Sequence, residues 1–549
     1  MLTLRLSLPN SFRGYLPRPA SRRLPRAASP QGPRALISER ITSLTINTPA
    51  PSAPPEADEA HSVLSALRSP KRLKTEVLAG LVVALALIPE AISFSIIAGV
   101  DPRVGLFASF VMAVSIAFLG GRPAMISAST GAIALVIAPV AREYGLDYFI
   151  ATVILAGIFQ VVLGVIGVAK LMRFIPRSVM VGFVNALAIL IFLAQVPHMT
   201  GVPMMVYPLI LVGLAIMVYL PRLTSVVPAP LVAIVLLTAA TVVFAINVPT
   251  VGDEGELPRS LPSLFVPDVP LNLETLQIIA PYAIAMALVG LLESLMTAKL
   301  VDDVTDTHSN KTREAWGQGA ANVITGFFGG MGGCAMIGQT MINVKASGAR
   351  TRISTFLAGI FLLALVVGLG DVVAMIPMAA LVAVMIIVAV ATFDWHSVRI
   401  DTLRRMPKSE TTVMVATVAV VVATHNLAIG VVVGVIVATL LFARRVAHLT
   451  QVTRLDRSDA DDQRVYAVTG ALFFASSNDL VYQFDYTGDP KNIVIDMSGA
   501  HIWDASTVAT LDAITTKYER KGKTVTIIGM NEASAERHER LAGRLGGGH

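Results

Sequence analysis

The chain has 549 residues, of which 54% are hydrophobic and 15% charged, and its mean hydropathy is +0.69. Soluble domains carry about 25% charged residues, so this composition excludes an ordinary soluble enzyme. The single cysteine, Cys334, excludes a disulfide framework and a cysteine-rich zinc or iron–sulfur site. We interpret Cys334 as a small apolar filler in a packed segment.

The net charge of +6 is unevenly distributed along the chain. The first 74 residues hold twelve Lys and Arg against four Asp and Glu, a balance of +8, which leaves −2 for the rest. Nucleic-acid binding requires a basic patch on the folded part. We therefore expect no nucleic-acid partner.

Residues 1–70 form a leader rich in Pro, Ser, Ala and Arg, and we expect it to be disordered. Its arginine-rich, acid-poor start is compatible with an organelle targeting segment and equally with translation from an upstream start. A cleaved secretory signal is not expected, because no apolar core with a small-residue cleavage site lies near Met1.

Residues 71–450 contain recurrent apolar stretches, each close to the roughly 20 residues that a helix needs to cross hydrocarbon. We predict about fourteen membrane segments, two of them short. Their centres lie near Leu85, Val114, Leu135, Val161, Leu187, Val212, Ile234, Ala285, Val323, Ile342, Leu362, Ala383, Val418 and Val435.

Threading these segments alternately through a bilayer separates the basic loop residues by side. Fifteen Lys and Arg fall on one side, and only Arg103, Arg142 and Arg259 fall on the other. Because positive loops stay in the cytoplasm, we expect a multi-pass protein of the cell membrane with both termini cytoplasmic.

The composition changes after the last segment. A polar linker at 451–463 leads into a small cytoplasmic α/β domain at 464–543, followed by a frayed tail at 544–549. Within that domain we predict three strand regions and one helix. These are strands at 465–474, 493–497 and 524–529, and a helix at 506–520.

An Ala-Met-Ile triplet occurs twice, at 124–126 and 335–337, 211 residues apart. Seven predicted segments separate the copies, and an odd number inverts the second copy in the membrane, as in many transporters. Each triplet leads from an extended run of small residues into a short apolar helix, at 129–139 and 340–346.

Two half-helices that begin inside the membrane direct their free N–H groups and positive dipole ends toward the same space. This arrangement predicts an anion site at the two helix starts; ordinary small-residue helix packing is the alternative. The predicted substrate-binding residues are Ser129, Thr130, Gly131, Gln339, Thr340 and Met341.

Acidic residues inside the membrane are costly and usually functional. Glu293 lies well inside the eighth segment with Thr297 one turn away, and Glu90 lies in the first segment after Pro89. A buried carboxyl group can hold a proton, or can present oxygens to sodium together with Thr297. We predict all three as ion-coupling residues; a purely structural pairing of each Glu is the alternative.

The sequence shows no Ser-His-Asp order, nucleotide-binding loop or paired metal ligands in a suitable context. We therefore predict no catalytic residues, no metal site and no cofactor. Gradient-driven transport is favoured over an enzyme.

At these residues the chain resembles the SulP family of sulfate-permease-type anion transporters from Thr75 to the C-terminus. The end of the chain resembles a STAS domain. The similar motifs are Pro102–Ser109, Gly182–Phe183, Glu293–Ser294, Gly319–Asn322, Ala346–Arg352, Asp496–Ser498 and Asp504–Thr507.

The resemblance implies an α-helical polytopic fold of two inverted seven-span repeats, split into core and gate domains, with an elevator-like movement of the core. It also implies a homodimer, an anion between the third and tenth segments, and a coupling carboxylate at Glu293. The chain departs from the family pattern at two places. Many members have Gln in place of Glu90, and the stretch Gly338–Thr340 lacks the arginine that many members carry there.

The expected function is proton-coupled symport of an inorganic anion, sulfate first. Sodium-coupled uptake of bicarbonate or a dicarboxylate is the first alternative, and a passive anion channel or exchanger is the second. The expected partners are thus a small inorganic anion, a proton or sodium ion, and membrane lipid.

Overall fold

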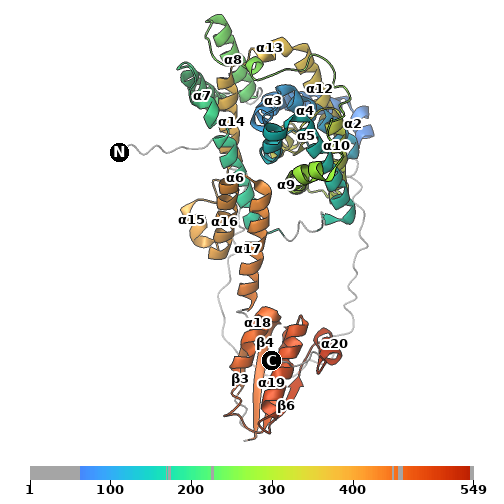
Figure 1. Ribbon diagram of the computed structural model, residues 1–549, viewed down its shortest axis with the longest axis vertical. Helices are drawn as coiled ribbons and strands as arrows, with labels where there is room; N and C mark the ends of the chain where they lie inside the picture. Colours follow the sequence, from blue (N-terminus) through green and yellow to red (C-terminus); the bar gives the residue numbers. More distant parts are fainter. Residues whose placement is uncertain are drawn as a thin grey trace, which may run out of the picture. The chain divides into compact units, whose positions relative to one another are not determined.

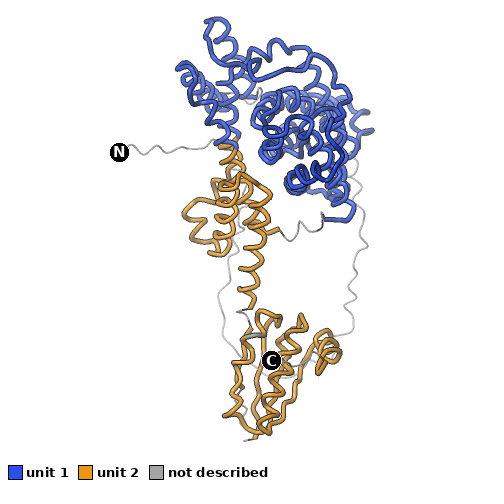
Figure 2. Tube along the Cα trace, in the orientation of Figure 1, with its two compact units in different colours: residues 1–170, 191–388 blue, residues 171–190, 389–549 orange. Residues whose placement is uncertain are grey.

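The computed structural model describes residues 62–168, 170, 175–223, 228–447, 450–455 and 462–544. Most of the predicted leader, part of the predicted linker and the tail beyond residue 544 lie outside this range. The first helix, α2 (Val63–Arg68), begins inside the stretch predicted as a disordered leader. The chain divides into two compact units, residues 1–170 with 191–388 and residues 171–190 with 389–549 (Figure 2).

The first unit is almost entirely helical (Figure 1). Its helices include α3 (Pro70–Ala98), α4 (Pro102–Leu119), α5 (Gly131–Ile166), α7 (Val206–Leu223), α8 (Ala229–Val243), α9 (Leu273–Thr305), α10 (Lys311–Phe327), α11 (Ile337–Met341) with a π-helical turn (Ile342–Ala346), α12 (Arg352–Gly368), α13 (Gly370–Ala374) and most of α14 (Met378–Thr392). Its only sheet among the described residues pairs β1 (Ser127–Ala128) with β2 (Cys334–Ala335).

The second unit contains α6 (Arg177–Leu193) up to residue 190, α15 (Ile400–Arg405), α16 (Lys408–Thr424) and α17 (Leu427–Ala447) before its α/β part. Small residues allow these helices to approach closely: a Cβ atom added to Gly182 on α6 would lie 2.8 Å from the Thr417 side chain on α16.

Within the described residues, seven helices are long and apolar enough to cross a membrane, and three shorter apolar helices accompany them. Every one of the fourteen predicted segment centres falls in a helix. The predicted segments centred on Leu135 and Val161 are both in α5, which is interrupted at Gly145 with φ 84°. Glycine adopts this backbone conformation without the strain a side chain would add.

In the first unit, α5 crosses α10 at a contact between two glycines. A Cβ atom on Gly157 would lie 2.7 Å from the carbonyl oxygen of Gly319, and one on Gly319 would lie 2.6 Å from that of Gly157. Close backbone approach through small residues is the usual basis of helix packing in membranes. It brings the polar face of α10 against α5.

The chain ends in a four-stranded sheet of order β3-β4-β5-β6. The strands β4 and β5 are parallel, as are β5 and β6, while β3 is antiparallel to β4. The elements are β3 (Gln451–Leu455), β4 (Gln463–Leu472), α18 (Phe474–Leu480), β5 (Asn492–Ile502), α19 (Ala505–Glu519), β6 (Thr524–Ile528) and α20 (Glu532–Leu541).

The predicted strands and helix correspond to β4, β5, β6 and α19, but the predicted linker contains β3. The sequence missed this strand because Gln451, Thr453 and Arg454 are polar, as is usual for an edge strand exposed to water. The sheet therefore begins at residue 451, earlier than the predicted domain start at 464.

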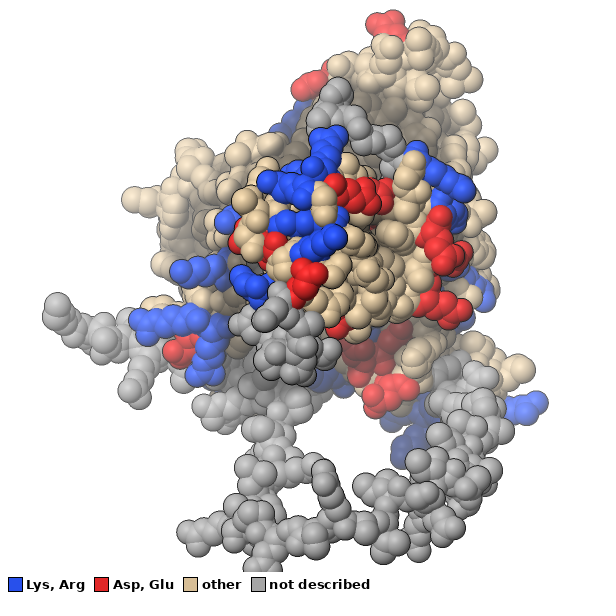
Figure 3. Space-filling model, turned by 90° about the horizontal axis from the view of Figure 1, so that it is seen from below, with Lys and Arg blue, Asp and Glu red and all other residues tan. Residues whose placement is uncertain are grey.

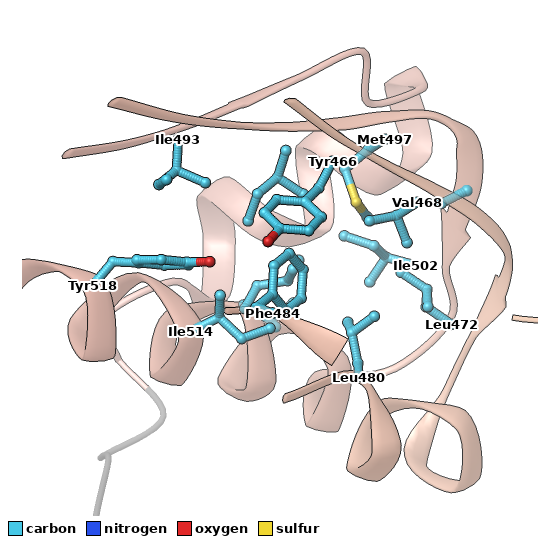
Figure 4. Close-up of a cluster of buried hydrophobic side chains, with 14 residues drawn as sticks. Tyr466, Val468, Leu472, Leu480, Phe484, Ile493, Met497, Ile502, Ile514 and Tyr518 are labelled. Carbon is cyan, nitrogen blue, oxygen red and sulfur yellow. The ribbon is translucent and has the colours of Figure 1, made fainter. Parts of the chain in front are cut away.

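The core of the α/β domain combines apolar side chains with a buried carboxylate (Figure 4). Figure 4 shows the hydroxyl groups of Tyr466 and Tyr518 directed into the same space. Both donate to Oδ2 of Asp489, at 2.8 Å and 2.6 Å, and Arg464 lies 3.6 Å from Oδ1. The buried charge of Asp489 is thus compensated by donors.

Figure 3 shows the face of the molecule seen from below. On this face Lys and Arg side chains lie close to Asp and Glu side chains, with uncharged residues between them.

Candidate functional site

Two extended segments cross and lead into the two predicted half-helices. The strand β1 precedes α5, β2 precedes α11, and the two strands pair antiparallel with Ser127 opposite Ala335. The crossing is close, because a Cβ atom on Gly333 would lie 2.0 Å from the carbonyl oxygen of Ala128. The prediction that both small-residue runs lead into helices is confirmed.

The first half-helix, the part of α5 before Gly145, begins at the N-cap Thr130. The Thr130 hydroxyl accepts a hydrogen bond from the Ile133 N–H at 3.4 Å. Gly131 is required at the first turn, since a Cβ atom there would lie 2.9 Å from the Phe94 ring. The first N–H groups of a helix have no partner inside it, so this end of α5 keeps donors for a ligand.

Ser129 is more constrained than the sequence suggests. Its N–H donates to Oγ of Ser109 at 3.3 Å, and the two hydroxyls lie 2.8 Å apart. The predicted Ser129 N–H donor is therefore already bonded within the protein.

The second half-helix begins earlier than predicted and continues through the π-helical turn to Ala346, the predicted end. The helix α11 starts at Ile337, and the Thr340 N–H donates to the carbonyl of Met336 at 3.1 Å. The Thr340 hydroxyl accepts from the Ile126 N–H at 3.0 Å and thereby ties α11 to the other extended segment. Met341 packs against an apolar cluster that includes Ala79.

Gln339 connects α11 to α3. Its Nε2 donates to Oε1 of Glu90 at 2.8 Å, and its own Oε1 is buried without a hydrogen-bond partner among the described residues. Next to it, Gly338 faces open space, because a Cβ atom there would meet nothing within 4 Å. Glu90 is half-buried. Two of the predicted residues, Glu90 and Gln339, are thus brought together.

Glu293 lies on α9 and is 7% exposed. Its Oε2 is 2.9 Å from Sγ of Cys334 on β2, and that sulfur is 3.1 Å from Oγ1 of Thr130. Among the described residues Glu293 forms no ion pair. The predicted coupling carboxylate and the predicted anion-binding N-cap are therefore joined through one thiol. The interpretation of Cys334 as a mere apolar filler was wrong, since its sulfur hydrogen-bonds on both sides.

Thr297 is buried one turn after Glu293, as predicted, but its hydroxyl faces backbone. It donates to the carbonyl of Glu293 at 2.8 Å and lies 3.4 Å from that of Ala335. The structure does not place this hydroxyl beside the Glu293 carboxylate. Within the part of the chain that is described, no group of three His, Cys, Asp or Glu side chains could hold a metal ion.

The helix α10 supplies a row of buried polar side chains that the sequence analysis did not select. Glu314 accepts from the N–H groups of residues 121 and 122, at 2.7 and 3.0 Å. Gln318 donates to Oγ of Ser127 at 2.6 Å, and Asn322 donates to the carbonyl of Gly333 at 3.0 Å. Their four-residue spacing places them on one face of the helix, and this spacing was the available signal.

The fold and this site together define a polytopic α-helical membrane protein with a small C-terminal α/β domain. The model of the Sulfate permease family matches residues 73–208 and 203–417, and the STAS domain model matches residues 454–542. The chain belongs to the sulfate permease family and carries a C-terminal STAS domain. Its relatives are anion transporters rather than enzymes.

Two relatives cover most of the chain. The Bacillus subtilis (strain 168) protein "Putative sulfate transporter YbaR" is 52% identical over 472 residues, which are 86% of this chain and 97% of that protein. The Bicarbonate transporter BicA of Picosynechococcus sp. is 25% identical over 525 residues, covering 86% of this chain and 91% of the relative.

Solved structures share the fold. The murine Solute Carrier 26 family member A9 anion transporter, in the inward-facing state, aligns with a TM-score of 0.75 at 17% identity, over 93% of this chain and 96% of the other. The transmembrane domain of a cyanobacterial bicarbonate transporter BicA aligns with a TM-score of 0.58 at 24% identity, over 67% of this chain and 98% of that domain.

Proposed function

We propose that this chain carries an inorganic anion, sulfate before others, across the membrane together with a proton, and that Glu293 is the coupling group. The observation that carries the proposal is the Glu293 carboxylate, buried on α9 without an ion pair among the described residues. A buried carboxylate without a cationic partner favours its protonated form. It can therefore take up and release a proton during transport.

The anion binds in this proposal at the starts of α5 and α11, near the Gln339 amide. The proposed substrate-binding residues are Ser129, Thr130, Gly131, Gln339, Thr340 and Met341. The bonds already made by Ser129 and Thr340 give these two a bracing role. The free donors at the start of α5 and the open space beside Gly338 support direct contact there. Glu90, bonded to Gln339, is proposed as a second ion-coupling residue.

The test is uptake of radiolabelled sulfate into proteoliposomes that contain the full chain. We expect an inward proton gradient to raise the rate, and Glu293→Gln to remove this dependence. Glu274→Gln, on the exposed first turn of the same helix, is the matched control. Unchanged proton dependence in Glu293→Gln would refute Glu293 as the coupling group, and absence of gradient-driven sulfate uptake in the wild type would refute the proposal.

Sodium-coupled bicarbonate uptake is the second candidate. It is favoured by the similarity to a protein named Bicarbonate transporter BicA. Dicarboxylates belong to the same alternative. Replacing the proton gradient by a sodium gradient, with labelled bicarbonate as substrate, separates the two: stimulation by sodium alone would favour this candidate. Thr297 would then be tested as a sodium-coupling residue.

Alternating access by an elevator-type movement of the core, a homodimeric assembly and cytoplasmic placement of both termini in the cell membrane complete the proposal. The resemblance to the family implies the first two. The placement of the termini is favoured by the charge of the loops, with fifteen Lys and Arg on one side and three on the other. Single-channel currents in planar bilayers would instead favour a passive channel, and uptake that requires only a counter-anion would favour an exchanger.

A further inference from the structure

Three buried side chains form a continuous hydrogen-bonded row from α9 to the start of α5. Oε2 of Glu293 is 2.9 Å from Sγ of Cys334, and Sγ is 3.1 Å from Oγ1 of Thr130. The same Thr130 oxygen accepts the N–H of Ile133 and so caps α5. Cys334 is 0% exposed and Thr130 is 2% exposed, so water does not compete for these contacts.

When Glu293 is ionised, the numbers of hydrogens and lone pairs on these three groups allow only one donor-to-acceptor direction along the row. A carboxylate can only accept, a thiol has one hydrogen, and a hydroxyl has one hydrogen and two lone pairs. The Cys334 S–H must then donate to Glu293, and the Thr130 O–H donates to the sulfur. In this state the only hydrogen of the Thr130 hydroxyl is directed away from a ligand.

Protonation of Glu293 allows the opposite direction. The carboxyl O–H donates to Sγ, the S–H turns to Oγ1 of Thr130, and the Thr130 oxygen accepts from both the thiol and the Ile133 N–H. The Thr130 O–H is thereby released and can donate to an anion at the first turn of α5. One proton is added at Glu293, and no other bond is formed or broken.

We propose that Cys334 is a positioning residue that couples proton binding at Glu293 to anion binding at the start of α5, by reversing the donor direction of this row. The inference rests on the proposed function and names its coupling route. It assigns the single thiol of the chain a role in transport.

The other polar groups near Glu293 are hydrogen-bonded elsewhere, so Cys334 is the group that can connect Glu293 to the start of α5. Thr297, on the same helix, donates to backbone carbonyls, and Ser294 accepts the N–H of Ala335 at 3.1 Å. The other buried or half-buried carboxyl groups of the unit have partners of their own. Glu90 is bonded by Gln339, Glu314 by Gln318 and the N–H groups of residues 121 and 122, and Glu76 by the N–H groups of residues 350 and 351.

The first measurement is the Kd for sulfate of the purified full chain at acidic and at neutral pH, by isothermal titration. In the wild type we expect tighter binding at acidic pH by about fivefold or more, the lower end of ordinary coupling between two sites. Cys334→Ala breaks the row and is expected to bring the ratio of the two Kd values close to one. Cys334→Ser keeps one hydrogen and two acceptor positions and is expected to retain the ratio. Thr152→Val, which removes a buried hydroxyl elsewhere on α5, is the control.

The outcomes distinguish failure of the proposed function from failure of the role inferred for Cys334. A wild-type Kd that does not vary with pH, together with uptake that ignores the proton gradient, would overturn the proposed function. A wild-type ratio that Cys334→Ala leaves intact would overturn this inference alone. An equal loss of the ratio in Cys334→Ser would also count against it, because that variant preserves the donor and the acceptors.

A second readout does not depend on the folding of a Cys334 variant. The chain contains one cysteine, so its S–H stretching band in the infrared spectrum belongs to Cys334. We expect the band to shift between neutral and acidic pH in the wild type. In Glu293→Gln, whose amide N–H can donate to sulfur as the carboxyl O–H does, we expect it to stay at the acidic position. A band that is the same at both pH values in the wild type would refute the reversal.

Discussion

The side-chain amide of Asn322 forms a pair of hydrogen bonds with the backbone of Gly333. The Gly333 N–H donates to Oδ1 at 2.8 Å, and Nδ2 donates to the Gly333 carbonyl at 3.0 Å. A second contact from Nδ2 reaches Oε1 of Gln160 on α5 at 2.8 Å. The helix α10 thus fixes the chain immediately before β2, and with it the position of Cys334.

Replacing Asn322 by Leu is expected to lower the free energy of unfolding by about 1–3 kcal/mol, because the buried N–H and carbonyl of Gly333 lose their partners. Thermal unfolding of the purified protein in detergent measures the change. Thr325→Val on the same helix removes only a bond to the Ala321 carbonyl of its own helix and should cost less. Equal stability of Asn322→Leu and the wild type would contradict the bracing role.

The glycines on either side of β2 should differ sharply in their tolerance of alanine. Gly333→Ala would place a Cβ atom 2.0 Å from the Ala128 carbonyl oxygen, whereas Gly338→Ala meets nothing within 4 Å. We expect the first variant to lose folded protein, because a backbone atom cannot move aside without breaking the β1–β2 pair. The second should fold as the wild type does. Monodispersity in size-exclusion chromatography measures both, and normal yield of Gly333→Ala would contradict the close crossing.

The tyrosines of the STAS domain are expected to make the domain less stable at alkaline pH. Burial raises the pKa of Tyr486 to about 12, and burial together with the hydrogen bond to Asp489 raises the pKa of Tyr518 well above its usual value. A free tyrosine ionises near pH 10, so above that pH the unfolded state loses protons that the folded state retains. The contribution of these tyrosines to the free energy of unfolding is therefore fully present below about pH 10, and it decreases as the pH rises further.

Denaturant unfolding of the full chain at neutral pH and above pH 10, followed by the signal of the STAS domain, checks this dependence. Tyr482→Phe, at a largely exposed tyrosine, should leave the profile unchanged. A free energy of unfolding that rises above pH 10 would contradict the raised pKa values of Tyr486 and Tyr518.

Tyr518→Phe removes one of the two hydroxyl donors to Oδ2 of Asp489. Because the carboxylate stays buried with fewer donors, we expect a loss of about 1–3 kcal/mol in the free energy of unfolding of this domain. Tyr466→Phe should cost a similar amount, and the double variant should cost more than either. Differential scanning calorimetry measures the three, and stabilisation by Tyr518→Phe would show that Asp489 does not depend on the pair.

The sequence was sufficient for features that depend on long apolar runs. All fourteen segment centres fall in helices, and the half-helix starts near residues 130 and 340 follow from small residues placed before apolar ones. Glu293 could be selected because a carboxyl group is conspicuous in an apolar segment. These signals depend on residues that are close together in the sequence, so they can be recognised without knowledge of the fold.

Other parts of the site depend on contacts between distant residues. A lone cysteine among small apolar residues is typical of an apolar filler. Only the position of Cys334 between Thr130 and Glu293 gives its sulfur two polar neighbours. Thr340 was a plausible ligand by sequence, but the neighbouring chain segment at Ile126 occupies its hydroxyl. These partners lie 41 to 214 residues apart. Contacts at such separations leave no periodic pattern in one sequence, so these assignments required the fold.

The pairing of β1 with β2 also bears on how a molecule of this kind can be divided. Each strand comes from a different repeat, and each satisfies backbone groups that lipid cannot. A chain cut between the repeats would leave an unpaired edge in each half. We therefore expect neither fragment to persist alone in a bilayer. A gene that encodes a single repeat would need its product to associate with a second, oppositely oriented copy, so that the strand before each half-helix finds a partner.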